Sequence, residues 1–208
     1  MPRIPSVPPV TWALIVANTV IYILQLGASE GLIRYFALWP LGASPALGPD
    51  ALGAFQPWQL VTYSFLHGSF THLFLNMLAL FMFGSEIERL FGTRRYLAYY
   101  FAAVLAAAVT QIAVSTATGS FYPTVGASGG VFGLLLAYGI YFPRRTIVLL
   151  FPPIPMPAWL FVIVYAVIEL YLGVTGTQAG VAHFAHLGGM LGGFLMLRYW
   201  RRRSRLRQ

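Results

Sequence analysis

The sequence has 208 residues, of which 58% are hydrophobic and only 9% are charged, and its mean hydropathy is +0.72. Soluble domains are usually about 45–50% apolar and about 25% charged, so this composition nearly excludes a water-soluble fold. The 16 Phe, 12 Tyr and 5 Trp exclude a disordered chain. The absence of cysteine excludes disulfides and thiolate metal sites.

Six segments are apolar enough for membrane-spanning helices, which need roughly 20 mostly apolar residues. In chain order they are residues 10–26, 71–84, 96–115, 128–142, 157–172 and 182–200. The first lacks a small-residue cleavage site and further spans follow it, so we do not interpret it as a signal peptide. The prediction is an all-α polytopic membrane protein. Residues 1–208 form one domain, with an outer loop at 27–58 and a basic tail at 201–208.

All 13 positive charges are arginines, and their placement predicts the orientation of the chain. Six spans put both termini on one side of the membrane. Twelve arginines fall on that side and only Arg34 on the other, so we expect both termini in the cytoplasm. The basic tail could be a nucleic-acid patch, but contact with anionic lipid is the simpler interpretation.

Polar side chains gather near the outer ends of the second, fourth and sixth predicted spans. Polar groups inside spans are costly and usually functional. Under the predicted topology these residues share one depth, which favours an outward-facing catalytic site. They are Thr71, His72, Asn76, Ser128, His183 and His186.

Ser128 lies in a run of glycines, Gly126-Ala127-Ser128-Gly129-Gly130, at the start of the fourth span. Small residues spaced by four follow in this span and in the sixth, where they include Gly189. Such stripes let membrane helices pack backbone to backbone. If the two stripes face each other, Ser128 and His186 come within reach, as a nucleophile and its general base require.

His72 and Asn76 are four residues apart and therefore share a helix face. Both can donate hydrogen bonds to one point, which suits stabilisation of an oxyanion. The free N–H groups at the start of the helix headed by Ser128 favour an oxyanion as well. The alternative is that His72 and Asn76 only tie helices together.

Metal and aspartyl chemistry are weaker interpretations. The four histidines include a helical pair, His183 and His186, but there is no HExxH motif and no carboxylate nearby in sequence. Glu169 is the one plausible mid-span acid, where an aspartyl mechanism needs two. A pairing or gating role for Glu169 stays open, and we expect no metal and no cofactor.

Together these motifs resemble the rhomboid intramembrane serine proteases over nearly the whole chain. The matching stretches are His72-Leu73-Phe74-Leu75-Asn76, Gly126-Ala127-Ser128-Gly129 and Ala185-His186-Leu187-Gly188-Gly189. Glu86-Ile87-Glu88-Arg89 followed by Phe91-Gly92 also looks like this family. The resemblance implies a six-helix rhomboid-like bundle.

The resemblance also implies roles for individual residues. Ser128 would be the nucleophile and His186 the general base of a dyad. His72, Asn76 and the backbone N–H of Ser128 would stabilise the oxyanion, and Phe132 would pack against the His186 ring. The sequence departs from the family at Trp58-Gln59, where many members have Trp-Arg, which puts the anchoring of the outer loop in doubt.

The implied function is a serine endopeptidase that cleaves single-span membrane proteins near the outer face of the bilayer. Substrates would enter between the second and fifth spans, with Phe161 as a candidate gate. A prokaryotic plasma membrane suits so small a form. One alternative is a rhomboid-like protein that binds membrane clients without cutting them. A small transporter is another, but its polar groups should line a path across the membrane.

Overall fold

The computed structural model describes residues 6–42, 54–149, 152–177 and 181–205. Its elements are nearly all helices, in this order: α1 (Pro9–Phe36), α2 (Gln59–Thr62), the 3-10 helix η1 (Tyr63–Phe65), α3 (Phe70–Ala79), the π-helix η2 (Leu80–Gly84), α4 (Ser85–Phe91), α5 (Thr93–Thr118), α6 (Ser128–Tyr141), α7 (Ala158–Thr175) and α8 (His183–Arg205). Two short antiparallel strands, β1 (Thr146–Val148) and β2 (Pro155–Pro157), connect α6 to α7.

The predicted helical class is confirmed, and four helical stretches within the described residues are long and apolar enough to cross a membrane. They are α1, the continuous run Phe70–Phe91, α5 and α7. The helix α6 is a shorter apolar helix of 14 residues. The sixth predicted span lies in α8, whose apolar stretch is interrupted by histidines, glycines and arginines. The count of six spans therefore remains a prediction.

One expectation about the connecting segments was wrong, and one feature of them was not predicted. The predicted outer loop at 27–58 starts too early, because α1 continues to Phe36 with a break in its helical geometry at Ala28. The weak apolar pattern after Gly27 concealed this extension. The strands β1 and β2 were not predicted, because proline-rich flanking sequence does not mark a strand.

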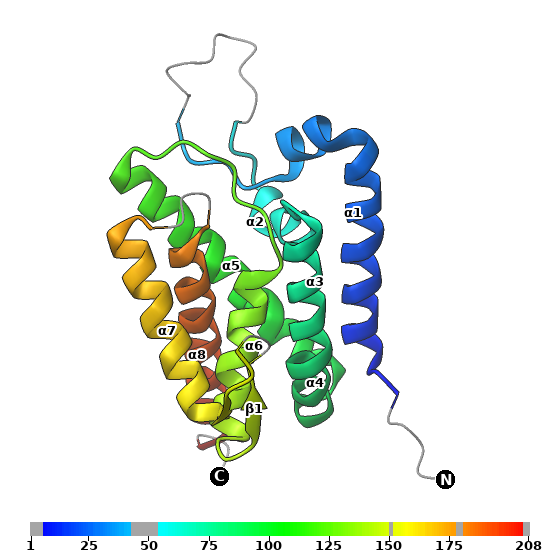
Figure 1. The fold of residues 1–208 in the computed structure, drawn as a ribbon, viewed down its shortest axis with the longest axis vertical. Coiled ribbons are helices and arrows are strands. Elements are labelled where there is room, and N and C mark those ends of the chain that lie inside the picture. Colours follow the sequence, from blue (N-terminus) through cyan, green and yellow to red (C-terminus); the bar gives the residue numbers. More distant parts are fainter. Residues whose placement is uncertain (1–5, 43–53, 150–151, 178–180, 206–208) are drawn as a thin grey trace.

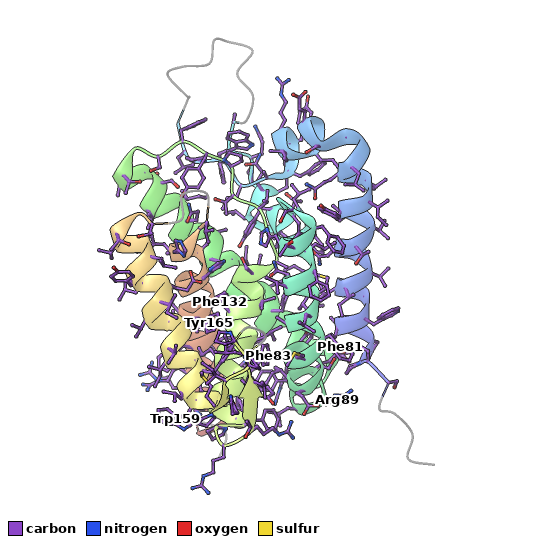
Figure 2. All side chains as sticks on the ribbon, in the orientation of Figure 1. Phe81, Phe83, Arg89, Phe132, Trp159 and Tyr165 are labelled. Atoms are coloured by element: carbon purple, nitrogen blue, oxygen red, sulfur yellow. The ribbon has the colours of Figure 1, made fainter. Side chains whose placement is uncertain are left out.

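The helix α6 is the centre of the bundle, and α1 stands at one edge beside α3 (Figure 1). Ten of the 14 residues of α6 are buried, as expected for a helix that is apolar on every side. Large apolar side chains instead point outward from the surrounding helices (Figure 2). Leu26 and Val174, for example, are 73% and 72% exposed. An apolar outer surface of this kind suits lipid.

The start of α6 lies inside the bundle, short of the end where α3 and α8 begin (Figure 1). A 14-residue helix is about 21 Å long, which is less than the roughly 30 Å thickness of a bilayer core. The first residue of α6 is Ser128. The fold therefore places this serine below the end of its neighbours.

Candidate active site

Backbone hydrogen bonds fix the segment that leads into Ser128. Thr124 and Leu38 exchange two of them, at 3.0 and 2.9 Å, and the N–H of Gly126 donates to the carbonyl of Tyr63 at 3.0 Å. Gly126 has φ +129°, a conformation that favours glycine. The turn therefore starts α6 at Ser128, and the first N–H groups of the helix have no partner within it.

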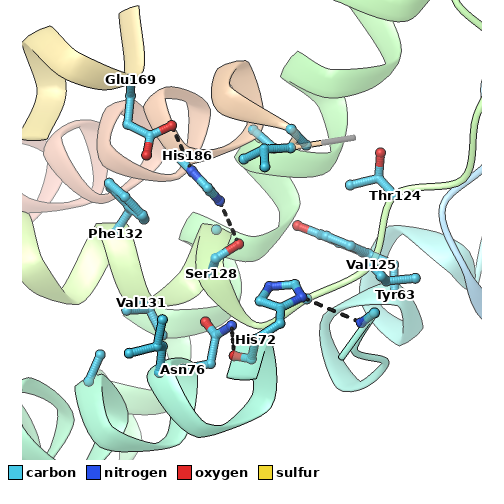
Figure 3. Close-up of a pocket in the computed structure, with 18 of the residues that line it drawn as sticks. Tyr63, His72, Asn76, Thr124, Val125, Ser128, Val131, Phe132, Glu169 and His186 are labelled. Atoms are coloured by element: carbon cyan, nitrogen blue, oxygen red, sulfur yellow. Dashed lines mark hydrogen bonds and ion pairs between the residues drawn. The ribbon is translucent and has the colours of Figure 1, made fainter. Parts of the chain in front are cut away.

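Ser128 and His186, predicted to come together, are in hydrogen-bond contact across α6 and α8. Ser128 Oγ lies 2.7 Å from His186 Nε2 (Figure 3). The His186 ring stacks on Phe132, with ring centroids 4.3 Å apart and an interplanar angle of 4°. Phe132 lies one turn after Ser128 on the same helix, so α6 supplies both the hydroxyl and the face on which the imidazole rests.

Glycines bring α6 and α8 close enough for this contact, as the small-residue stripes predicted. A Cβ at Gly189 would collide with the backbone carbonyl of Gly129, and one at Gly133 would lie 3.2 Å from the Gly189 oxygen. The neighbouring glycines of α8, Gly188 and Gly192, face α5 instead. Each Gly-Gly pair of α8 thus permits close packing on two sides.

His72 reaches the same turn from α3. The Ser69 hydroxyl caps this helix by accepting from the His72 N–H at 3.1 Å, and His72 Nδ1 accepts from the Gly68 N–H at 3.4 Å. A Cβ on Gly126 would lie 2.8 Å from His72 Nε2 and 3.5 Å from Ser128 Oγ. The acceptor role of Nδ1 places the ring hydrogen on Nε2, which faces the serine turn.

Asn76 lies on the same side of α3 as His72, facing the cavity (Figure 3). Its amide donates one hydrogen to the His72 carbonyl at 2.9 Å, and only 5% of the residue is exposed. An amide has two hydrogens, so one is left for another acceptor. Asn76 therefore forms a hydrogen bond within α3 and also faces the cavity.

Glu169 on α7 is the residue whose role the sequence left open. Its Oε2 lies 2.9 Å from His186 Nδ1 and 2.7 Å from His183 Nδ1. The sequence has no carboxylate near His186 along the chain, which agreed with a dyad, but the fold brings Glu169 to this histidine from another helix. An acid in the middle of an apolar helix was the available signal, but its partners on α8 cannot be read from spacing.

The nitrogen and oxygen atoms of Glu169, His183 and His186 all lie within 4.8 Å of one another. Within the described part of the chain, this trio is the candidate set of metal ligands. Their mutual hydrogen bonds account for the close spacing, and His186 also contacts Ser128 through its other nitrogen.

A cavity of about 650 Å³ opens beside these residues. Its walls come from α3, η2, the segment before α6, α6, α7 and the start of α8, and it includes Ser128, His186, His72 and Asn76. An aromatic wall between η2 and α7 holds Phe83, Phe161 and Tyr165. The polar side chains of Ser128, His186, His72 and Asn76 thus line one part of the cavity, and aromatic side chains line another.

Gln59, which follows Trp58 where the sequence departs from the usual Trp-Arg, forms hydrogen bonds to two segments that precede it in the chain. The residue is fully buried, and its Oε1 accepts from the Trp39 N–H at 3.2 Å. Its Nε2 donates to the carbonyls of Tyr35 at 3.3 Å and Ala54 at 3.2 Å. The glutamine amide thus links the backbone at Tyr35, Trp39 and Ala54, so an anchor is present here without an arginine.

The family model described as the rhomboid domain matches residues 54–203. The chain belongs to the rhomboid family. It is 32% identical to the rhomboid protease GluP of Bacillus subtilis over 139 residues, 66% of this chain and 25% of that protein. It is 30% identical to the mitochondrial RHOMBOID-like protein 6 of Arabidopsis thaliana over an alignment of 227 positions, gaps included, which covers 89% of this chain and 66% of that protein.

A third relative is the mitochondrial rhomboid protein 1 of Saccharomyces cerevisiae, 30% identical over 65% of this chain and 40% of that protein. The rhomboid chain thus spans between a quarter and two thirds of the length of these relatives. They include bacterial and mitochondrial proteins, so membership in the family leaves open which membrane holds the chain.

Proposed function

We propose that this rhomboid chain is an intramembrane serine endopeptidase in which Ser128 is the nucleophile and His186 its general base. The 2.7 Å contact between Ser128 Oγ and His186 Nε2, beside a cavity, is the observation that carries the proposal. A serine within hydrogen-bond reach of an imidazole is the arrangement that activates a hydroxyl for acyl transfer.

Ser128 Oγ attacks the scissile carbonyl carbon while its proton moves to His186 Nε2. The resulting oxyanion is met by the Ser128 backbone N–H, His72 Nε2–H and the second amide hydrogen of Asn76. His186 then protonates the leaving amine, which leaves an acyl-serine. Water then gives a proton to the same nitrogen and attacks the ester carbon, and His186 returns this proton to Ser128 Oγ as the C–Oγ bond breaks and the acid leaves.

The proposed substrates are single-span membrane proteins, cut near the outer face of the bilayer. The short α6 supports this depth, and the cavity supports lateral access between α3 and α7, past Phe83 and Phe161. A substrate helix must unwind there to expose a peptide bond, and the polar part of the cavity gives water a place to act.

We further propose six spans with both termini in the cytoplasm of a prokaryotic cell. The start of α1 and the end of α8 lie at the same end of the bundle (Figure 1). Arg89 lies in the last turn of α4 and Arg145 follows α6, and both helices run toward that end, whereas Arg34 lies in the last turn of α1, at the other end. This distribution supports the orientation that the positive-inside rule predicts.

The test is labelling of purified protein in detergent with a fluorophosphonate probe. We expect wild type to be labelled and Ser128→Ala and His186→Ala to remain unlabelled. The matched control is Ser85→Ala, which removes a buried hydroxyl on α4 that has no hydrogen-bond partner and should label like wild type. A folded wild type that does not label would contradict the proposal and favour client binding without cleavage.

A further inference from the structure

The carboxylate of Glu169 continues the line of hydrogen bonds that begins at Ser128. Ser128 Oγ to His186 Nε2 is 2.7 Å, and His186 Nδ1 to Glu169 Oε2 is 2.9 Å. Figure 3 shows the three side chains in sequence, contributed by α6, α8 and α7. We infer that Glu169 is a positioning residue that completes a Ser–His–Glu triad in this chain, an inference that rests on the proposed function.

The proposed role of His186 as general base defines which ring nitrogen carries its hydrogen, and an acceptor beside Nδ1 favours that arrangement. For His186 Nε2 to take the serine proton, this nitrogen must carry a lone pair, so the ring hydrogen is on Nδ1. Glu169 Oε2 accepts that hydrogen and thereby fixes the productive tautomer. Phe132 supports the face of the ring, but stacking does not distinguish the two nitrogens, so it cannot perform this task.

His183 keeps the carboxylate in place. Its Nδ1 lies 2.7 Å from the same Oε2, and its buried Nε2 has no hydrogen-bond partner. A doubly protonated His183 would bury an unpaired N–H, which is costly, so the fitting form is neutral with the hydrogen on Nδ1. Glu169 therefore retains one negative charge that His183 does not neutralise.

That charge becomes important when the serine reacts. The Ser128 proton passes to His186 Nε2, and His186 becomes an imidazolium while Glu169 stays ionised. The Glu169 side chain is 10% exposed and that of His186 is 12% exposed. In so sheltered a place a carboxylate stabilises the imidazolium more than it would in water. His186 returns the proton from Nε2 to the leaving amine, and Glu169 ends the cycle unchanged.

The test compares Glu169→Gln and Glu169→Asp with wild type, using the same fluorophosphonate probe over a range of concentrations. We expect Glu169→Gln to lower the maximal labelling rate roughly 10²-fold or more, with little change in the probe concentration at half-maximal rate, because the amide can hold the wrong tautomer. Glu169→Asp should restore part of the rate. Glu88→Gln, at another buried carboxylate, is the matched control and should label like wild type.

Nitrogen-15 spectra of histidine-labelled protein distinguish a positioning role of Glu169 from a role in folding alone. Wild type should show His186 with Nδ1 protonated and Nε2 unprotonated, and Glu169→Gln should show a mixture of tautomers at an unchanged melting temperature. Labelling of Glu169→Gln at the wild-type rate would overturn the triad and leave the proposed function standing. Absence of labelling in folded wild type would instead overturn the proposed function.

The same experiment separates the triad from a metal site built on these three residues. Treatment of wild type with EDTA should leave the labelling rate unchanged if hydrogen bonds alone join Glu169 to the two histidines. Loss of labelling with EDTA, restored by added zinc, would overturn the inference and assign Glu169, His183 and His186 as metal ligands.

Discussion

Two buried glutamates, Glu88 on α4 and Glu169 on α7, hold partners of different kinds. Glu88 is 2% exposed and accepts from the N–H of Val10 at 3.1 Å, from the N–H of Thr11 at 2.7 Å and from the Thr11 hydroxyl at 2.8 Å. Glu169 is 8% exposed and accepts from two imidazoles.

The two sets of partners indicate a structural role for Glu88 and suit the chemical role proposed for the site that contains Glu169. Val10 and Thr11 are in the first turn of α1, whose N–H groups have no partner within the helix, so Glu88 caps α1 and joins it to α4. Donors of that kind never change their protonation. The donors to Glu169 are imidazoles, a group that can take up and release protons, and one of these rings contacts a serine in a cavity. A buried acid is thus classified by whether its partners can exchange protons.

The largest effect on stability is expected from Glu88→Ala. The change leaves buried donors on Val10 and Thr11 without an acceptor, so the free energy of unfolding should fall by about 3 kcal/mol or more. Glu86→Ala is the matched control: its ion pairs with Arg89 and Arg145 are partly exposed, and their loss should cost less than about 1 kcal/mol.

Denaturant unfolding in detergent measures both variants, and fluorophosphonate labelling per folded molecule should equal that of wild type in each. Equal stability losses in the two variants would show that Glu88 is no more important to the fold than a surface charge. Loss of labelling in folded Glu88→Ala would contradict the conclusion that Glu88 acts only on stability.

The next effect is expected at the turn before Ser128. Gly126→Ala forces a side chain into a backbone with φ +129° and places Cβ 2.7 Å from the His72 ring. If His72 donates to the oxyanion as proposed, its displacement from the serine should lower the labelling rate about 100-fold, the usual result of losing one such donor.

Gly92→Ala is the control for strain alone. Gly92 has φ +74°, and no atom would lie within 4 Å of an added Cβ. This variant should lose about 1 kcal/mol of stability and keep its labelling rate. If Gly126→Ala labelled as fast as Gly92→Ala, His72 would have no part in the reaction.

Much of this site was predictable because its signals lie within single helices. Glycine spacing on α6 and α8 indicated the packing that joins Ser128 to His186, and polar residues in apolar spans indicated the layer that holds His72. The contacts of Glu169 with His183 and His186 were not predictable, since they depend on how α7 and α8 are placed against each other. The anchoring by Gln59 was missed for the same reason, because its partners lie on separate segments.

The smallest effect is expected from loss of the ring that supports His186. Phe132→Leu removes a stacked contact worth about 0.5–1.5 kcal/mol, so labelling should slow by up to about tenfold if Glu169 still fixes the tautomer. Phe91→Leu is the matched control, because Phe91 makes edge-on contacts with Tyr99, Tyr141 and Trp200, away from the cavity.

Phe91→Leu should therefore lower the melting temperature and leave the labelling rate unchanged, whereas Phe132→Leu should lower the labelling rate. Combining Phe132→Leu with Glu169→Gln then measures how the two supports share the task. A loss in the double variant that exceeds the product of the single losses would mean that ring and carboxylate substitute for each other. A simple product would mean that stacking fixes the plane of the imidazole, and the carboxylate its tautomer, independently.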